Sequence, residues 1–262
     1  MMYTIAISNE KGGVAKTTTT LSLGAALAEL GRKVLLIDLD PQANLTLALG
    51  FEPHNIALSS GDLLLESVPL LSICQKTTYD NLELIPANSK MDRAEQLLPI
   101  HLNYASRLND AIQEASPMPY EYLLIDCPPA IGAVTRNALD AANLLIIPTQ
   151  AEYFSAYALR DMMALIRNVR NESNPSIAYR VLITMLDQRN RAHRTIREQL
   201  HSTFGDGLFE TIIEIDTKLR ESPIVGMPIT EYKPNSRGSR QYRVLAQELE
   251  EYVKQQTNRQ PT

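Results

Sequence analysis

A short stretch near the amino terminus carries the residues best suited to bind phosphate. It reads SNEKGGVAKTTTT (residues 8–20), with Lys11 and Lys16 on either side of a glycine pair. Backbone N–H groups of a glycine-containing turn, and the positive end of a following helix, can converge on phosphate oxygens. In such a loop Lys16 would contact the β- and γ-phosphates, Thr17 would offer its hydroxyl to Mg²⁺, and Thr18 could reach the α-phosphate. The stretch therefore predicts a nucleotide-binding loop.

The general phosphate-loop pattern, G-x-x-x-x-G-K-[ST], fails at both of its glycine positions, and Ala15 stands at the second of them. A second pattern, K-G-G-x-x-K-T-[ST], fits every position. On these residues the stretch resembles the deviant P-loop of the ParA/MinD class of ATPases. The resemblance implies ATP and Mg²⁺ as cofactors, with the nucleotide held by Lys11, Gly12, Gly13, Val14, Ala15, Lys16, Thr17 and Thr18.

The outer lysine, Lys11, lies five residues before Lys16 and is poorly placed to join it on the same phosphates. In the family that the loop resembles, this lysine reaches across a dimer to the nucleotide bound by the partner. We therefore expect Lys11 to supply a charge in trans, as an arginine finger does. Dimerisation and ATP binding would then be linked.

Three aspartates follow two apolar, strand-like segments. Asp38 and Asp40 lie in KVLLIDLDPQAN (33–44), and Asp126 ends YLLID (122–126). The first segment resembles the D-x-D-P-Q-x-N of ParA proteins, which implies that Asp40 lies in switch I, near the attacking water and the water shell of the metal. Asp38 could help to hold the P-loop or Mg²⁺, or it could cap a helix or a turn. Asp126 resembles the switch II aspartate and is expected to hold a metal-bound water, although a simple strand-end cap is the alternative. The catalytic candidates are thus Lys11, Lys16 and Asp40, and the metal candidates are Thr17, Asp40 and Asp126.

The site for the base is less well marked. ATP is favoured over GTP because the chain has no N-K-x-D motif. Adenine contacts in the family come from the loops after 180–186 and 210–215, which implies Glu214 and Asp216, although relatives usually read I-P-x-N from position 213 to 216. A further departure is Tyr157-Ala158, where relatives commonly have Glu-Gly, in a stretch (148–159) expected near the dimer interface.

Apolar runs of strand length alternate with helical stretches along the chain. Because the strand candidates are rich in Ile, Leu and Val and lack strict alternation, they are typical of strands buried on both faces. This pattern predicts an α/β fold, in which a mainly parallel sheet carries helices on both faces and ligands at the carboxyl ends of its strands. The segment 51–80 is the least periodic and is expected to be a helical excursion or a partner surface. The strand candidates are 3–8, 33–39, 82–86, 122–126, 144–148, 180–186 and 210–215, and the helix candidates are 16–30, 104–115, 153–170, 191–203 and 240–256.

Bulk properties favour one globular domain. The 262 residues are 44% hydrophobic and 21% charged, which suits a single α/β domain over 1–262 with a flexible tail at 257–262. Since the chain begins at its first strand, we expect no N-terminal helix-turn-helix domain. No signal peptide or membrane-length apolar run is present in the sequence, so a cytoplasmic location is expected. Cys74 and Cys127 are too far apart for a CxxC pair and predict neither a disulfide scaffold nor a zinc or iron–sulfur site.

Basic residues gather in two stretches of an otherwise acidic chain. The net charge is −5, so an attraction to nucleic acid must come from a local patch. QRNRAHRTIR (188–197) has no acidic residue, and DTKLRES (216–222) adds two basic ones. In ParA relatives, basic residues in these regions form a DNA surface without sequence preference; an ordinary solvated basic face is the alternative. The resemblance implies DNA binding through Arg189, Arg191, Arg194, Lys218 and Arg220.

Together these features predict an ATP-dependent dimer that binds DNA and uses the nucleoid to partition or position a cargo, which is a plasmid, a chromosome or a protein organelle. The resemblance implies slow ATP hydrolysis that a ParB-like or adaptor protein stimulates, and a nucleoid-associated location. A MinD-like membrane-associated regulator is the alternative, but the acidic polar face of the terminal helix, with Glu248, Glu250 and Glu251, predicts no membrane binding. A third hypothesis is an enzyme of metal-cofactor assembly or a reductase.

Overall fold

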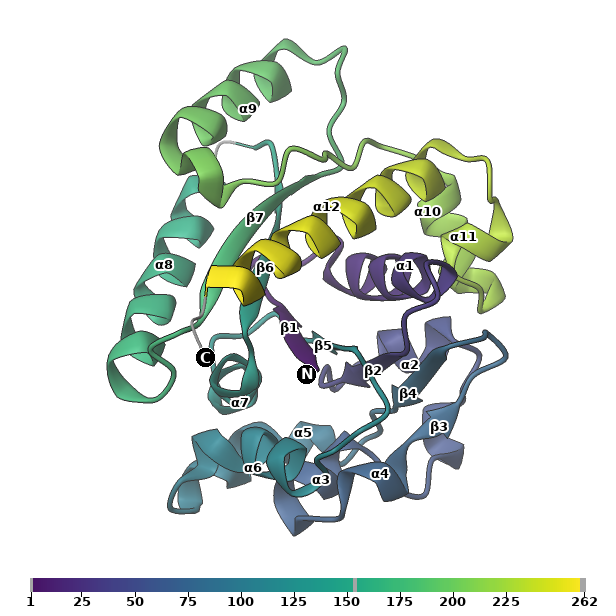
Figure 1. Ribbon diagram of the computed structural model, residues 1–262, viewed down its shortest axis with the longest axis vertical. Coiled ribbons are helices and arrows are strands. Elements are labelled where there is room, and N and C mark those ends of the chain that lie inside the picture. Colours follow the sequence, from purple (N-terminus) through teal and green to yellow (C-terminus); the bar gives the residue numbers. More distant parts are fainter. Residues whose placement is uncertain (1, 153–154, 260–262) are drawn as a thin grey trace.

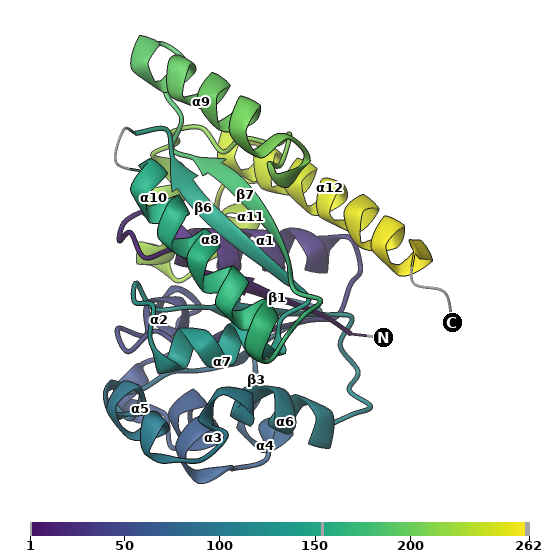
Figure 2. The same ribbon diagram turned by 90° about the vertical axis from the view of Figure 1, so that its left-hand side faces the viewer.

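A parallel sheet forms the centre of the molecule (Figures 1 and 2). The computed structural model describes residues 2–152 and 155–259. Within these residues the sheet has seven strands in the order β3-β4-β2-β5-β1-β6-β7. All neighbouring strands are parallel except β3, which is antiparallel to β4. The strands are β1 (Tyr3–Ile7), β2 (Val34–Asp38), β3 (Gln75–Lys76), β4 (Leu82–Ile85), β5 (Tyr122–Asp126), β6 (Leu144–Gln150) and β7 (Ala178–Thr184).

Helices cover both faces of the sheet, because successive strand side chains point to opposite faces and both sets are apolar. In β2, Leu35 and Ile37 join the buried cluster under one helical layer, and Val34 and Leu36 join the cluster under the other. The first layer holds α3 (Ser60–Glu66), α4 (Leu70–Ile73), α5 (Met91–Leu97), α6 (Arg107–Glu114), α7 (Ala133–Ala141) and α8 (Ser155–Glu172). The second holds α1 (Lys16–Glu29), α2 (Asn44–Ala48), α10 (Lys218–Glu221), α11 (Ile229–Tyr232) and α12 (Arg237–Arg259).

Helix α9 (Arg191–Phe204) and several short 3-10 turns are the remaining helical elements of the described residues. Helix α9 lies at the β7 edge of the sheet (Figure 1). Short 3-10 turns are η1 (Pro53–Asn55), η2 (Leu98–Ile100), η3 (Tyr104–Ser106), η4 (Gly205–Gly207) and η5 (Ser222–Val225). In the described part of the chain, no helix combines the length and the apolar character needed to cross a bilayer.

The predicted fold class is confirmed, and one predicted strand is wrong. Residues 210–215 form no strand; this region contributes only isolated bridges between Val181 and Leu208 and between Leu186 and Glu214. Side chains of helix α12 accept hydrogen bonds from several backbone N–H groups that a strand would use for pairing. The carboxylate of Glu248 accepts the N–H groups of residues 210 and 211 at 2.8 and 3.0 Å, and Gln241 accepts that of Glu214 at 3.0 Å.

Helix ends also differ from the expected ranges. Helix α12 continues to Arg259, so the tail expected at 257–262 is helical over 257–259, and 260–262 lie outside the described residues. The helix expected from 153 begins at Ser155, with 153–154 outside the described residues. The weakly periodic segment 51–80 is a helical excursion, as expected, because it holds η1, α3 and α4.

Helix α1 lies close against the sheet and is held there by α12. Gly24 permits the close packing, since a Cβ at this position would lie 2.7 Å from the Leu36 side chain. Buried Tyr242 of α12 contacts the Thr19 hydroxyl at 3.0 Å. Arg243 donates to Glu29 at 2.6 and 2.9 Å. The helix that follows the P-loop is therefore fixed on two sides.

Candidate nucleotide site

The loop between β1 and α1 has the conformation of an anion cradle. Gly13 and Ala15 both have left-handed backbones, with φ of 73° and 68°. Glycine adopts this conformation freely, whereas alanine pays roughly 1 kcal/mol for it. Ala15 is also the residue before α1, and no side chain caps the N–H groups of the first turn. Those N–H groups can therefore serve an anion.

Asn9 holds the entrance of the P-loop in place. Its side chain is buried, donates from Nδ2 to the Pro148 carbonyl at 2.7 Å, and accepts the Lys11 N–H on Oδ1 at 3.0 Å. The loop entrance is thus fixed to the end of β6.

Two further side chains hold the carbonyl side of the loop. Gln150 Nε2 donates to the Gly13 carbonyl at 2.9 Å, and Thr184 Oγ1 donates to the Val14 carbonyl at 3.0 Å. Because these carbonyls are bound to β6 and β7, the loop N–H groups are left for a ligand. The sequence reasoning missed both residues; their position at the carboxyl ends of predicted strands was the available signal.

Two aspartates lie side by side at the same edge of the sheet. Asp38 and Asp126 are register partners at the ends of β2 and β5, and both are fully buried. Asp126 accepts hydrogen bonds from Thr17 Oγ1 at 2.7 Å and from Thr20 Oγ1 at 3.2 Å. Burial, and then the neighbouring charge of Asp38, raise the pKa of Asp126 well above its usual value. A cation at this point would favour the ionised form.

Asp38 adopts the turn-and-cap role, the second of its two expected alternatives. It accepts Thr46 N–H at 2.9 Å and Thr46 Oγ1 at 2.7 Å in the first turn of α2, and it accepts the Asp40 N–H at 3.1 Å. Burial raises the pKa of Asp38 to about 6 despite these hydrogen bonds. Asp38 therefore shapes the segment that carries Asp40.

Lys16 and Asp40 complete the polar centre. Lys16 is buried, and its Nζ donates to the Lys11 carbonyl at 3.3 Å. Burial lowers the pKa of Lys16, while the charges of Asp126 and Asp40 oppose that shift. Asp40 is also buried, and its Oδ1 accepts the Gln42 N–H at 3.0 Å. Asp126 thus lies near two further carboxylates, Asp38 and Asp40, and near one buried ammonium group, an imbalance that a divalent cation would correct.

These residues fit Mg²⁺ bound together with a nucleotide. Hydroxyl and carboxylate oxygens are the ligands that Mg²⁺ prefers, and Mg²⁺ usually keeps several waters. The described residues contain no group of three or more His, Cys, Asp or Glu placed to hold a metal ion. Thr17, Asp40 and Asp126 are the residues that would hold Mg²⁺ here.

Lys11 lies at the rim of the loop in an ion pair. Its Nζ is 2.5 Å from Glu152 Oε2, in the segment after β6. The Lys11 side chain is 28% exposed and that of Glu152 is 49% exposed. Lys11 is therefore accessible from outside the subunit, but its charge is already balanced within the chain.

Known proteins share this arrangement over almost the whole chain. The AAA domain family matches residues 2–179. Sporulation initiation inhibitor protein Soj of Bacillus subtilis is 39% identical over 246 residues, which cover 94% of this chain and 97% of Soj. Chromosome partitioning protein ParA of Caulobacter vibrioides is 36% identical over 247 residues, covering 94% and 92%. The chain belongs to the ParA/Soj family of deviant P-loop ATPases.

A solved structure shows the same fold in a different enzyme. Cobyrinic acid a,c-diamide synthase of Mycobacterium smegmatis has a TM-score of 0.83 and 32% identity, over 97% of this chain and 96% of that one, and was solved with ADP and magnesium. It was also solved with an ATP analogue and magnesium. The P-loop of the ParA/Soj chain thus lies in a fold that holds a magnesium nucleotide in a relative.

A small cavity beside the P-loop is the candidate base pocket of this ParA/Soj protein. Glu214 and Asp216 lie in its wall, as expected, but protein groups already occupy their carboxylates. Glu214 accepts from Gln188 at 2.9 Å and from Arg237 at 2.5 Å, and Asp216 accepts the N–H groups of residues 218 and 238 at 2.9 Å each. Their contacts with adenine stay a prediction. The wall also includes Ala15, Thr18, Met185, Arg220 and Tyr242.

The structure brings the two basic stretches of the ParA/Soj chain together. The bridge between Leu186 and Glu214 and the hydrogen bond from Gln188 to Glu214 join the loop before α9 to the loop before α10. The loops that lead into the two stretches therefore lie side by side, and we refer to the two stretches together as the basic surface.

The five basic residues of this surface differ in their charge balance. Arg189 donates to both oxygens of Asp187 at 3.0 Å, and Lys218 donates to both oxygens of Glu221 at 2.7 and 2.9 Å. Across residues 2–152 and 155–259, no carboxylate pairs with Arg191, Arg194 or Arg220. These three arginines carry the unbalanced charge.

Two departures from the ParA pattern lie at the start of α8. Tyr157 is exposed, with the Arg160 guanidinium 5.6 Å from the centre of its ring, and Ala158 is half-buried. Both lie shortly after Glu152, the partner of Lys11. An aromatic ring and an arginine therefore lie together near the start of α8.

Proposed function

We propose that this chain is an ATPase that dimerises around Mg²⁺-ATP, binds DNA without sequence preference and positions a cargo on the nucleoid. The observation that carries the proposal is the loop itself. Lys16 is buried near Asp126 and Asp40, while Lys11 lies partly exposed at the rim, where a second subunit can reach it. The ParA/Soj relatives support ATP as the nucleotide and partition as the process.

The catalytic roles follow from the positions of the side chains. Bound Mg²⁺ would neutralise charge on the β- and γ-phosphates. Lys16 would bind the same phosphates from the buried side, and Asp40 would orient the attacking water. Lys11 would leave Glu152 and reach the nucleotide of the partner subunit. One domain over 1–262 would perform these steps in the nucleoid-associated cytoplasmic pool, and a ParB-like or adaptor protein would accelerate the slow hydrolysis.

The nucleotide and dimer steps are tested with three alanine variants. Lys16→Ala should lose ATP binding, because Lys16 supplies the buried positive charge of the P-loop. Lys11→Ala should bind ATP and remain monomeric. Asp40→Ala should bind ATP, lose hydrolysis and accumulate as a dimer. Equilibrium sedimentation with Mg²⁺-ATP measures the dimer, and phosphate release measures hydrolysis. An Asp40→Ala protein that stays monomeric with saturating Mg²⁺-ATP, or that hydrolyses ATP at the normal rate, contradicts the proposal.

The DNA step is tested by removing the unbalanced arginines. The Arg191→Ala/Arg194→Ala variant should bind DNA about tenfold more weakly with ATP, and its affinity should depend less steeply on salt. Arg167→Ala is the matched control, since Arg167 is an exposed arginine on α8. Equal loss in the control would remove the DNA surface from the proposal. Anionic vesicles should not sediment the protein; ATP-dependent sedimentation would instead favour a MinD-type regulator.

A further inference from the structure

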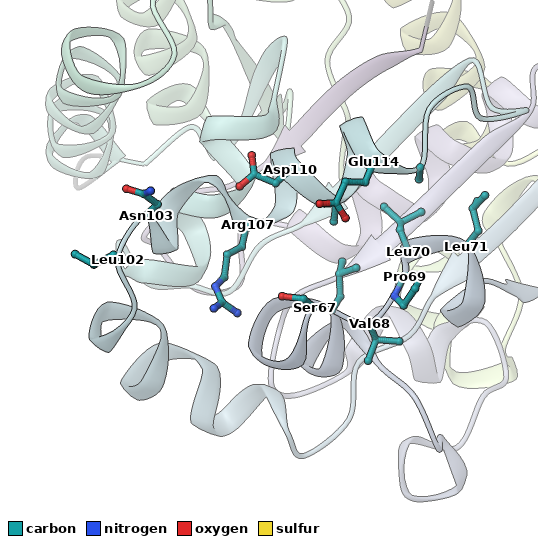
Figure 3. A pocket seen from close by; sticks show the side chains of 13 residues that line it. Ser67, Val68, Pro69, Leu70, Leu71, Leu102, Asn103, Arg107, Asp110 and Glu114 are labelled. Carbon is teal, nitrogen blue, oxygen red and sulfur yellow. The ribbon is translucent and has the colours of Figure 1, made fainter.

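A groove lies between α3–α4 and α6 on the layer of helices opposite α1 (Figure 3). Its volume is about 650 Å³. It is formed by the weakly periodic segment 63–71 on one side and by 102–115 on the other. The nucleotide site uses none of these residues. The floor is apolar and consists of Leu63, Val68, Pro69, Leu70, Ala111 and Ala115.

Exposed leucines extend this floor at both ends. Leu71 is 47% exposed and Leu102 is 96% exposed, and both line the groove. Ile100, two residues before Leu102, is 75% exposed. A single exposed leucine is ordinary, but apolar side chains gathered on the rim of a concave apolar floor are typical of an interaction surface.

The rim of the groove is acidic. Asp110 and Glu114 are one turn apart on α6, both are exposed, and neither has a basic partner in the described part of the chain. Arg107 also lines the groove, but its guanidinium donates to the carbonyls of residues 64 and 65 at 2.7 and 3.1 Å. Figure 3 shows it reaching toward the end of α3 beside Ser67. Its hydrogen-bond donors are thus directed at α3. Asp110 accepts a hydrogen bond from Ser106 Oγ at 2.8 Å, so in the described residues the carboxylates on α6 have no basic partner.

We propose that this groove docks a short amphipathic segment of a partner protein, with apolar side chains on the floor and Lys or Arg beside Asp110 and Glu114. Charge complementarity selects this occupant. The acidic rim would repel nucleic acid and anionic lipid, and docking of a second copy of this chain is an outcome that the test below separates. The groove is distinct from the DNA surface and from the rim that carries Lys11.

Helix α3 connects this groove to the nucleotide site. At its start, Ser60 Oγ donates to the Asp38 carbonyl at 2.6 Å, next to the segment that holds Asp40. At its end, Arg107 binds its last carbonyls. A segment seated in the groove therefore contacts a helix whose other end is tied to switch I, so the rate of ATP hydrolysis is a useful second readout.

The test uses the full chain and two fluorescent helical peptides. One peptide carries leucine on one face and lysine on the other, and its control carries glutamate in place of lysine. The lysine peptide should bind and the glutamate peptide should not. Asp110→Lys/Glu114→Lys should weaken binding of the lysine peptide at least about tenfold, through two lost attractions and two new repulsions. Basal ATP hydrolysis should be unchanged, because both residues are remote from the nucleotide.

Two further variants keep the result interpretable. Asp80→Lys/Asp206→Lys makes the same change in net charge at exposed positions outside the groove and should bind the peptide normally. Leu102→Ser removes a side chain that packs on almost nothing, so it should fold normally and still weaken binding. No binding of the lysine peptide, equal weakening in both charge-reversal variants, or nucleotide-independent self-association that Leu102→Ser abolishes would each overturn the proposal.

Discussion

The ion pair between Lys11 and Glu152 places a cost on the use of Lys11 in trans. Lys11 can serve a neighbouring subunit only after it leaves a carboxylate 2.5 Å away. Both side chains are partly exposed, and exposed ion pairs contribute at most about 1 kcal/mol. The pair therefore restrains Lys11 weakly, and it can open when a nucleotide and a second subunit approach.

Releasing this restraint should favour the dimer. Glu152→Gln should lower the protein concentration needed for ATP-dependent dimerisation by up to about thirtyfold, the equivalent of about 1 kcal/mol for each of the two ion pairs that open when a dimer forms. Sedimentation of hydrolysis-blocked protein over a concentration series measures the shift. Glu10→Gln is the control, because Glu10 is exposed in the same loop. A dimer weakened by Glu152→Gln would mean that Glu152 assists assembly instead of opposing it.

Single residues of the site were predictable where a local motif marks them. The P-loop residues and the aspartates ending β2 and β5 are local signals, and the structure brings Lys16, Thr17, Asp40 and Asp126 together. Contacts across long sequence distances were not predictable. Lys11 and Glu152 are 141 residues apart, and Thr184 and Val14 are 170 apart, so no spacing rule connects them.

At the scale of elements, α3 shows how a short helix is fixed at its start. Ser59 and Asp62 form a capping box, and Lys90 binds the Asp62 carboxylate. Although burial acts to raise it, the hydrogen bonds from Lys90 and Ser59 hold the pKa of Asp62 below its usual value. The charged form of Asp62 is thus bound more strongly in the folded protein.

This pKa shift makes the contribution of the cap depend on pH. Because the pKa is lower in the folded state, the stabilisation is present above the unfolded pKa of about 4 and is lost as pH falls through the folded pKa. Asp62→Asn should therefore cost about 1 kcal/mol in the free energy of unfolding at pH 7, and this cost should shrink as the pH falls below about 4. Urea titrations of both proteins measure the difference. Glu66→Gln, at an exposed position on the same helix, should show no such trend.

Helices and strands were predictable from the sequence when they contain a long run of buried apolar residues. Six strands and the long helices carry enough apolar residues to reveal their period. Residues 210–215 have the composition of a strand, but Glu248 and Gln241, distant in sequence, bind their N–H groups. Short elements such as α2, α10 and β3 depend on contacts made elsewhere in the fold and have no period of their own.

On the scale of the whole molecule, the nucleotide-binding helix and the acidic groove lie on opposite faces of the sheet. Its α1 side holds the helix that begins at the P-loop, and its α3–α6 side holds the acidic groove. Strand ends between the two layers carry Asp38 and Asp126. Events on the groove side can reach the nucleotide through α3 without altering the packing of α1.

The close approach of α1 to the sheet at Gly24 offers a way to control the protein in living cells. A methyl group at this position would displace the Leu36 side chain, and overpacking of this kind costs about 1–3 kcal/mol. For a chain of this size that lowers the melting temperature by roughly 2–4 °C per kcal/mol. Gly24→Ala should therefore yield a temperature-sensitive strain. A few degrees of warming should unfold the ATPase in that strain, although its active-site residues are unchanged.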